Sequence, residues 1–153
     1  MNKQERLDQV TTMKEQWLFK RIALGVLAGL SIYLLLQEVV PVGVGVMAIG
    51  ITLFLLHHYL MQEAHVLKEL TENERVKRIV LLQYRLDTLF IVLIALLFPL
   101  TMRFMPGSWS TQMLYIGAGV YILWTQRRLD GQLRQLDEHQ PTRREIQRNR
   151  FSF

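Results

Sequence analysis

Apolar residues along the chain gather in four long blocks that are separated by polar segments. The blocks cover about residues 18–36, 39–61, 86–102 and 109–124. The hydrocarbon core of a bilayer is about 30 Å thick, and a helix of about 20 apolar residues crosses it. The second block reaches this length without a charged residue, and the first does so if Lys20 and Arg21 extend toward the lipid headgroups. The third and fourth blocks are shorter and need interfacial residues or a thin bilayer.

A soluble four-helix bundle is the alternative, and the pattern argues against it. Its helices would show polar residues at every third or fourth position. Residues 90–100 contain no polar side chain, and residues 22–36 contain only Ser31 and Tyr33. Helices that are apolar all round lie in lipid or inside a much larger core, and 153 residues are too few to bury four of them. The sequence therefore predicts an all-α membrane protein with four transmembrane helices.

The basic residues predict the orientation. The chain has 18 Lys and Arg residues, 13 Asp and Glu residues and a net charge of +5. If the amino terminus is cytoplasmic and the chain crosses four times, every basic residue except Arg103 faces the cytoplasm, as the positive-inside rule requires. We therefore expect a multi-pass protein of the plasma membrane with both termini in the cytoplasm. Trp17, Tyr84 and Trp124 then fall at the inner interface, and Trp109 falls at the outer one.

The polar segments are predicted to be mainly helical extensions on the cytoplasmic side. Residues 62–85 indicate a helical hairpin, with Thr71 and Glu74 as a capping box that starts its second arm. The last helix is predicted to continue past Trp124 until Pro141 ends it. Residues 1–140 would thus form one domain, and 141–153 a basic tail. Three surfaces are candidate contacts for a partner. They are the exposed side of the 62–85 hairpin and two apolar stripes on the extensions: Leu7, Val10 and Met13, and Leu129, Leu133 and Leu136.

One cluster has residue types that bind metals. His57, His58, Glu63 and His65 follow one another at the inner end of the second block. Imidazole and carboxylate groups are ligands of zinc and iron, but the His-x-x-x-His and His-Glu-x-x-His spacings are missing. Packing of amphipathic rings at the membrane interface explains the histidines better, with a pH-sensing role as a further alternative. We therefore expect no metal and no cofactor.

Two ionisable residues, Arg85 and Asp87, lie at the boundary of the third block. An ionisable group within a span is by default a functional hypothesis, although its cost falls near the boundary. We expect Asp87 to pair with Gln83 or with a cation of another helix. The spans carry no charge at their midplanes, which argues against an ion-coupled transporter.

Glycines and arginines complete the candidate residues. Gly25 and Gly29 form a G-x-x-x-G motif in the first span, and these two residues and Gly117 are predicted to pack helices within the bundle, with dimerisation as the alternative. Basic residues next to the last span are predicted to bind anionic lipid headgroups or a partner. These are Arg127, Arg128, Arg143, Arg144, Arg148 and Arg150. No nucleic-acid-binding motif accompanies them.

Catalytic signatures are missing from the sequence. It contains no G-x-S-x-G motif, no glycine-rich phosphate-binding loop and no pair of carboxylates within a span. We therefore expect a non-enzymatic accessory, anchoring or regulatory subunit that acts through its cytoplasmic helices with a protein partner or by self-association. The alternatives are a small homo-oligomeric channel or transporter, a protective protein of the toxin- or peptide-immunity type, and a membrane metalloenzyme that uses His57, His58, Glu63 and His65.

Overall fold

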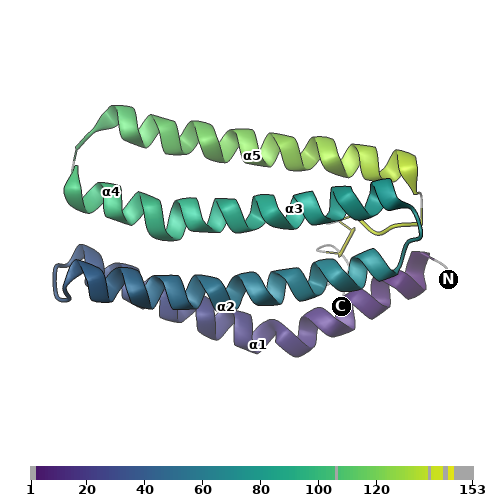
Figure 1. Ribbon diagram of the computed structural model, residues 1–153, viewed down its shortest axis with the longest axis horizontal. Coiled ribbons are helices and arrows are strands. Elements are labelled where there is room, and N and C mark those ends of the chain that lie inside the picture. Colours follow the sequence, from purple (N-terminus) through teal and green to yellow (C-terminus); the bar gives the residue numbers. More distant parts are fainter. Residues whose placement is uncertain (1–2, 106, 138, 143–144, 147–153) are drawn as a thin grey trace.

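A computed structural model describes residues 3–105, 107–137, 139–142 and 145–146. The regular elements are α1 (Lys3–Leu36), α2 (Val42–Glu69), α3 (Glu74–Val92), the π-helical turn η1 (Leu93–Leu97), α4 (Phe98–Phe104) and α5 (Trp109–Leu136), shown in Figure 1. Because α3, η1 and α4 follow one another without a break, the described residues form four long helices. The described residues contain no strand, so the all-α prediction is confirmed.

Three of the four helices are long and apolar enough to cross a membrane. They are Lys3–Leu36, Val42–Glu69 and Glu74–Phe104. Large apolar side chains cover their outer surfaces, as Phe19 at 82% and Phe54 at 70% exposure illustrate. A helix that exposes such side chains is suited to lipid. The predicted fourth span falls on α5, a helix of 28 residues that does not belong to this group of three.

The helices run up and down between two ends of different character. One end holds the start of α1, the turn between α2 and α3, and the end of α5; we call it the charged end (Figure 1). The other, the loop end, holds the short connections at 37–41 and 105–108. Helix α1 packs along α2, α2 along α3, and α3 along α5, so that α3 lies between α2 and α5 in Figure 1.

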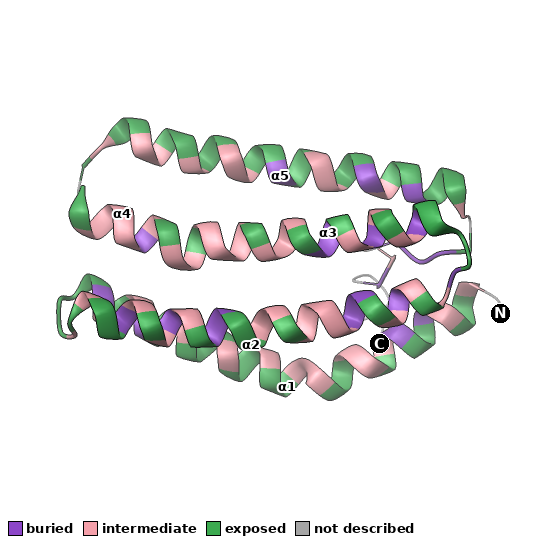
Figure 2. Cartoon of the chain, viewed as in Figure 1, coloured by how far each residue is buried: buried purple, intermediate pink, exposed green. Residues whose placement is uncertain are grey.

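The larger buried core lies at the charged end, where purple segments gather in Figure 2. Both predicted contact stripes take part in it, because Leu7, Val10, Leu129 and Leu133 are buried. These four residues stabilise the chain itself, which corrects the expectation for them, whereas Met13 is half-buried and Leu136 is 37% exposed. The core residues come from α1, α2, α3, α5 and the segment after α5: Val10, Ala64, Leu67, Val76, Val80, Tyr84, Leu133 and Ile146.

The hairpin between α2 and α3 is confirmed, but its predicted cap is wrong. Asn73, and not Thr71, is the N-cap of α3, and its side chain accepts a hydrogen bond of 3.0 Å from the N–H of Arg75. Asn is as good an N-cap as Thr, since its short side chain reaches the same free N–H groups. The Thr71 hydroxyl instead accepts from the N–H of Asn73 and donates to Asp137.

Helix α5 ends at Leu136, five residues before the predicted stop at Pro141. The chain then returns over the charged end, where Gln140, Pro141 and Thr142 are buried. Glu145 caps this turn, because its carboxylate accepts from the Thr142 N–H at 2.8 Å, which is one of the two bonds of a capping box, and from the Thr142 hydroxyl at 3.0 Å. The described part of the predicted basic tail is therefore packed against the helices, whereas Arg143, Arg144, Arg148 and Arg150 lie outside the described residues.

The π-helical turn η1 has a local cause. Pro99 lacks an N–H, and its ring would clash with the carbonyl of Ala95 in a regular α-helix. The widened turn at Leu93–Leu97 directly precedes Pro99 and relieves this clash while the helix continues.

The predicted packing glycines do not pack within the chain. Added Cβ atoms at Gly25, Gly29 and Gly117 would meet no described neighbour within 4 Å. The expectation of contacts inside the bundle is therefore wrong for these three glycines, and contacts with another chain stay a prediction. The close approach is at Gly45, where a Cβ would lie 2.8 Å from Cδ1 of Leu35.

Candidate functional site

A buried ion-pair cluster joins α1 to α2 near the charged end. Glu63 on α2 is 1% exposed, and its carboxylate receives two cations from α1. The Lys14 Nζ lies 2.6 Å from one oxygen, and Arg21 donates to the other at 2.7 Å. The two cations are seven residues apart, so they share one face of α1, which places both over Glu63.

The same carboxylate also binds α3. The Tyr84 hydroxyl donates a hydrogen bond to Glu63, and Tyr84 is itself only 2% exposed. Tyr84 was expected at the lipid interface, but it lies inside the helix bundle as a hydrogen-bond donor. Glu63 thus links three helices, and its two oxygens accept from three side chains, which meets the needs of a buried charge.

A polar chamber of about 260 Å³ adjoins this cluster. Asp87 on α3 and Gln126 on α5 form another part of its wall, and the Gln126 amide donates to Asp87 at 2.6 Å. Asp87 was expected to pair with Gln83 or with a cation of another helix, and the structure shows the Gln126 amide of α5 as one of its partners. Gln83 donates to Asp130, also on α5, at 2.8 Å. Two amide–carboxylate bonds therefore hold α3 to α5 at this end.

One hydrogen-bond donor of Arg21 lacks an acceptor among the described residues. Its second contact is with the carbonyl of Tyr59 at 3.3 Å. Its Nε is buried and has no hydrogen-bond partner among the described residues. A buried donor without an acceptor costs free energy, so the contact of Arg21 with α2 is not fully satisfied.

The predicted metal residues do not converge. His57 is hydrogen-bonded to Thr88 at 2.9 Å, and His58 is hydrogen-bonded to Gln62 at 2.9 Å. His65 is exposed near the C-terminal end of α2. Glu63 is occupied by its cations. Across the residues that the structure describes, no three His, Cys, Asp or Glu side chains are arranged to hold a metal ion.

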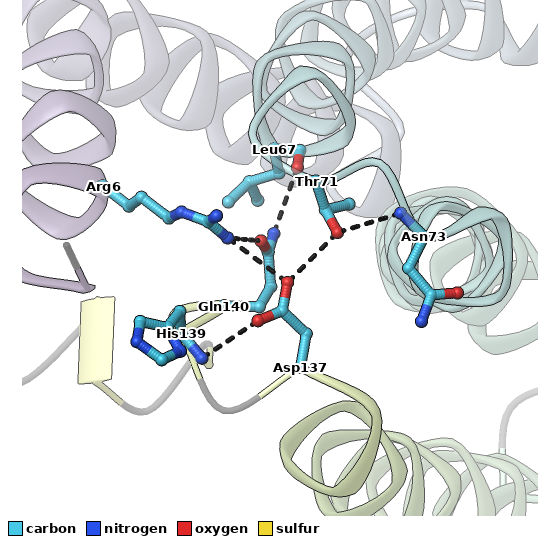
Figure 3. A network of polar contacts seen from close by, with 7 residues as sticks. All are labelled: Arg6, Leu67, Thr71, Asn73, Asp137, His139 and Gln140. Carbon is cyan, nitrogen blue, oxygen red and sulfur yellow. Dashed lines mark hydrogen bonds and ion pairs between the residues drawn. The ribbon is translucent and has the colours of Figure 1, made fainter. Parts of the chain in front are cut away.

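A second polar network fastens the segment after α5 to the charged end, as Figure 3 shows. Asp137 accepts from Arg6 at 3.3 Å and from the Thr71 hydroxyl at 3.1 Å. The buried Gln140 accepts from Arg6 at 3.3 Å and donates to the Leu67 carbonyl at 3.1 Å. The segment therefore contacts α1, α2 and the turn between α2 and α3 through polar bonds.

Two carboxyl groups of this segment are held in their charged form. Burial alone raises the pKa of Asp137, but the N–H of His139, the Thr71 hydroxyl and Arg6 outweigh it and lower the pKa below its usual value. Burial likewise raises the pKa of Glu145, and the N–H of Thr142 and the ammonium of Lys3, 2.9 Å away, lower it overall.

The remaining predicted residues lie on the surface. Arg85 is exposed on α3, and Arg127 and Arg128 are exposed on α5. The Arg128 guanidinium lies 5.8 Å from the centre of the Trp124 ring, a cation–π contact that leaves its charge near the predicted interface. These positions are compatible with lipid headgroups.

Sequence reasoning identified Glu63 and Asp87 but missed their partners. Lys14, Arg21 and Gln126 are distant in the sequence from the acids they bind. The available signal was that Lys14 and Arg21 lie two turns apart on one helix face, opposite a lone acid in the next helix. Comparison of the chain with models of known families, with curated proteins and with solved structures finds no match.

Proposed function

We propose that this chain is a non-enzymatic accessory, anchoring or regulatory membrane protein that engages a protein partner at its charged end. In this proposal all four helices cross the plasma membrane, and both termini are cytoplasmic. The exposed apolar residues of α5, such as Leu114 at 64% and Val120 at 61%, support a fourth crossing. The basic residues support this orientation, because with four crossings every Lys and Arg except Arg103 lies on the cytoplasmic side.

The observation that carries the proposal is a groove at the turn between α2 and α3. Because the two apolar stripes are mostly buried inside the chain, this turn is the remaining predicted contact surface. The groove has a volume of about 500 Å³. Its charged lining is mixed in sign, with Lys68, Glu69, Glu72, Glu74 and Lys77. Charges of both signs in a fixed arrangement favour a specific protein partner of complementary pattern over a uniformly charged surface.

Photo-crosslinking in intact membranes tests this function. A photoreactive residue at the exposed Glu72 should yield a product of defined mass with a second protein, whereas the same residue at the exposed Ser110, at the loop end, should not. If neither position yields a product and the protein isolated in mild detergent is a lone monomer, the accessory function is wrong.

A small channel or transporter is a second candidate, and the position of Asp87 in the wall of the polar chamber favours it. Flux through reconstituted liposomes that disappears in Asp87→Asn, with the variant still folded, would favour this function over the accessory role.

A further inference from the structure

The chain after α5 crosses the charged end as a strap, which we define as residues 137–146. The structure describes positions 137, 139–142 and 145–146 of this strap. Its far end is anchored to α1 in two ways. Ile146 is 2% exposed and belongs to the same buried cluster as Val10. Glu145 pairs with Lys3, at the start of α1, at 2.9 Å. The far end of the strap is therefore held by one apolar side chain and one ion pair.

The near end of the strap is bonded to both sides of the turn between α2 and α3, as Figure 3 shows. On the α2 side, Gln140 donates to the Leu67 carbonyl at 3.1 Å. This carbonyl is one of the last four of α2, and such carbonyls lack a partner inside the helix. On the α3 side, Asp137 accepts from the Thr71 hydroxyl, whose oxygen also accepts from the N–H of Asn73. The strap therefore fixes both the end of α2 and the start of α3.

The same turn forms the groove that is proposed as the partner surface. Thr71 is part of the groove lining, together with its neighbours Lys68 and Glu72. Thr71 is only 6% exposed, so its hydroxyl serves the bond to Asp137 inside the protein. A binding surface whose residues are held in place in advance loses less entropy when its partner binds. Attachment of the strap therefore favours binding at the groove.

The strap is held less firmly than the helices beneath it. Ile146 is its only residue with a large apolar side chain, and the remaining described bonds are polar. The side chains of the Lys3–Glu145 pair are 36% and 29% exposed, so water competes for this bond. Segments with few apolar contacts and partly exposed bonds open at a lower free energy than packed helices. The strap can therefore detach while the helices stay folded.

We propose that the strap is a regulatory element that controls the partner groove. When attached, it holds the turn between α2 and α3 in the shape that binds the partner. When detached, it leaves the turn mobile, and the charges of the groove lose their fixed arrangement. The effect on a partner rests on the proposed function, whereas the effect of the strap on the turn does not.

Hydrogen exchange of the purified protein in detergent, measured by mass spectrometry, tests the link between the strap and the turn. Glu145→Lys places a third cation beside Lys3 and Arg134 and should release the far end of the strap. The amides of residues 67–75 should then exchange about tenfold faster, which corresponds to about 1.4 kcal/mol. The amides of residues 46–56, in the middle of α2, should not change. Unchanged exchange at 67–75, or equal acceleration of both segments, would overturn the link.

Two further variants show whether the strap acts as one unit. Glu15→Lys, at an exposed position of α1, changes the net charge by the same amount and should leave the exchange unchanged. Gln140→Met keeps the size of the side chain but loses the bonds to Leu67 and Arg6. It should accelerate the same amides as Glu145→Lys. Acceleration by Gln140→Met alone would show that only the local bond holds the turn and would overturn the strap as a unit.

Crosslinking from a photoreactive residue at position 72 tests the effect on a partner. At equal expression in intact membranes, Glu145→Lys should lower the yield of the product about tenfold, because binding requires the attached strap, and Glu15→Lys should not change it. An undiminished yield despite faster exchange at 67–75 would overturn the regulation. If the protein without these substitutions gives no product, the proposed function is wrong and the effect on a partner falls with it, whereas the exchange experiment decides the link to the turn on its own.

Discussion

The ammonium of Lys14 lies 2.6 Å from the carboxylate of Glu63, and it fastens the first helix to the buried face of the second. Arg21 reaches the other oxygen of the same carboxylate at 2.7 Å. Both cations are themselves largely buried, so solvent screens this cluster far less than an ion pair on the surface. A single carboxylate thus holds together two cations that would otherwise repel each other.

Removing that carboxylate should destabilise the fold. Glu63→Gln removes the anion that Lys14 and Arg21 share, and we expect the free energy of unfolding to fall by about 3 kcal/mol. Denaturation in detergent, followed by circular dichroism, measures this loss. The matched control is Glu69→Gln, an exposed acid on the same helix, which should change stability by about 0.5 kcal/mol or less. Equal effects of the two substitutions would refute a structural role for the cluster.

Two glycines at the start of α2 should respond oppositely to alanine. A Cβ at Gly45 would lie 2.8 Å from Cδ1 and 3.3 Å from Cβ of the fully buried Leu35, so Gly45→Ala should destabilise the fold by about 1 kcal/mol or more. Gly43 has open space, and Gly43→Ala should be neutral or stabilise the helix by up to about 1 kcal/mol. The thermal unfolding of the two variants, compared with that of the unsubstituted protein, measures both effects. A Gly45→Ala variant that is as stable as the unsubstituted protein would contradict the close contact with Leu35.

The segment after α5 should loosen in acid. Because the folded pKa of Asp137 lies below the value of about 3.9 for an unfolded chain, its contribution to stability is complete above that value and is lost as the pH falls through the lowered pKa. The lowered pKa of Glu145 acts in the same direction. A spin label at the exposed position of His139→Cys should therefore become more mobile below about pH 4.

Two controls define the cause of that transition. A spin label at the exposed Gln132→Cys on α5 should keep its mobility over the same range, because that helix does not depend on these groups. Asp137→Asn should raise the mobility of the label at residue 139 already at neutral pH. If both labels loosen together, the transition is global and not a release of this segment.

The apolar blocks predicted the helices well because lipid imposes a simple requirement on length and composition. They also predicted the hairpin at 62–85. The end of α5 was misplaced, since Pro141 marks only the latest possible stop. The helix ends five residues earlier, at Leu136, and the next residue, Asp137, contacts Arg6 and Thr71. A local pattern cannot reveal such a distant partner.

The site was predicted only in part for a related reason. Glu63 stood out as an acid beside three histidines, and its neighbours in the sequence suggested metal ligands. Its partners in space come from α1 and α3, at separations of 42 and 21 residues for Arg21 and Tyr84. The two stripes that contain Val10 and Leu133 were recognised as apolar, but whether such a stripe packs inside the chain or against a partner depends on the tertiary fold.

The topology is tested most directly by labelling single cysteines in intact cells with a membrane-impermeant maleimide. The chain contains no cysteine, so each variant has one reactive site. Val39→Cys and Ser108→Cys, at the loop end, should be labelled from outside, whereas Glu72→Cys and Gln132→Cys should be labelled only after the membrane is opened. Labelling of Gln132→Cys from outside together with Ser108→Cys would show that α5 does not cross the membrane and would contradict the four-span account.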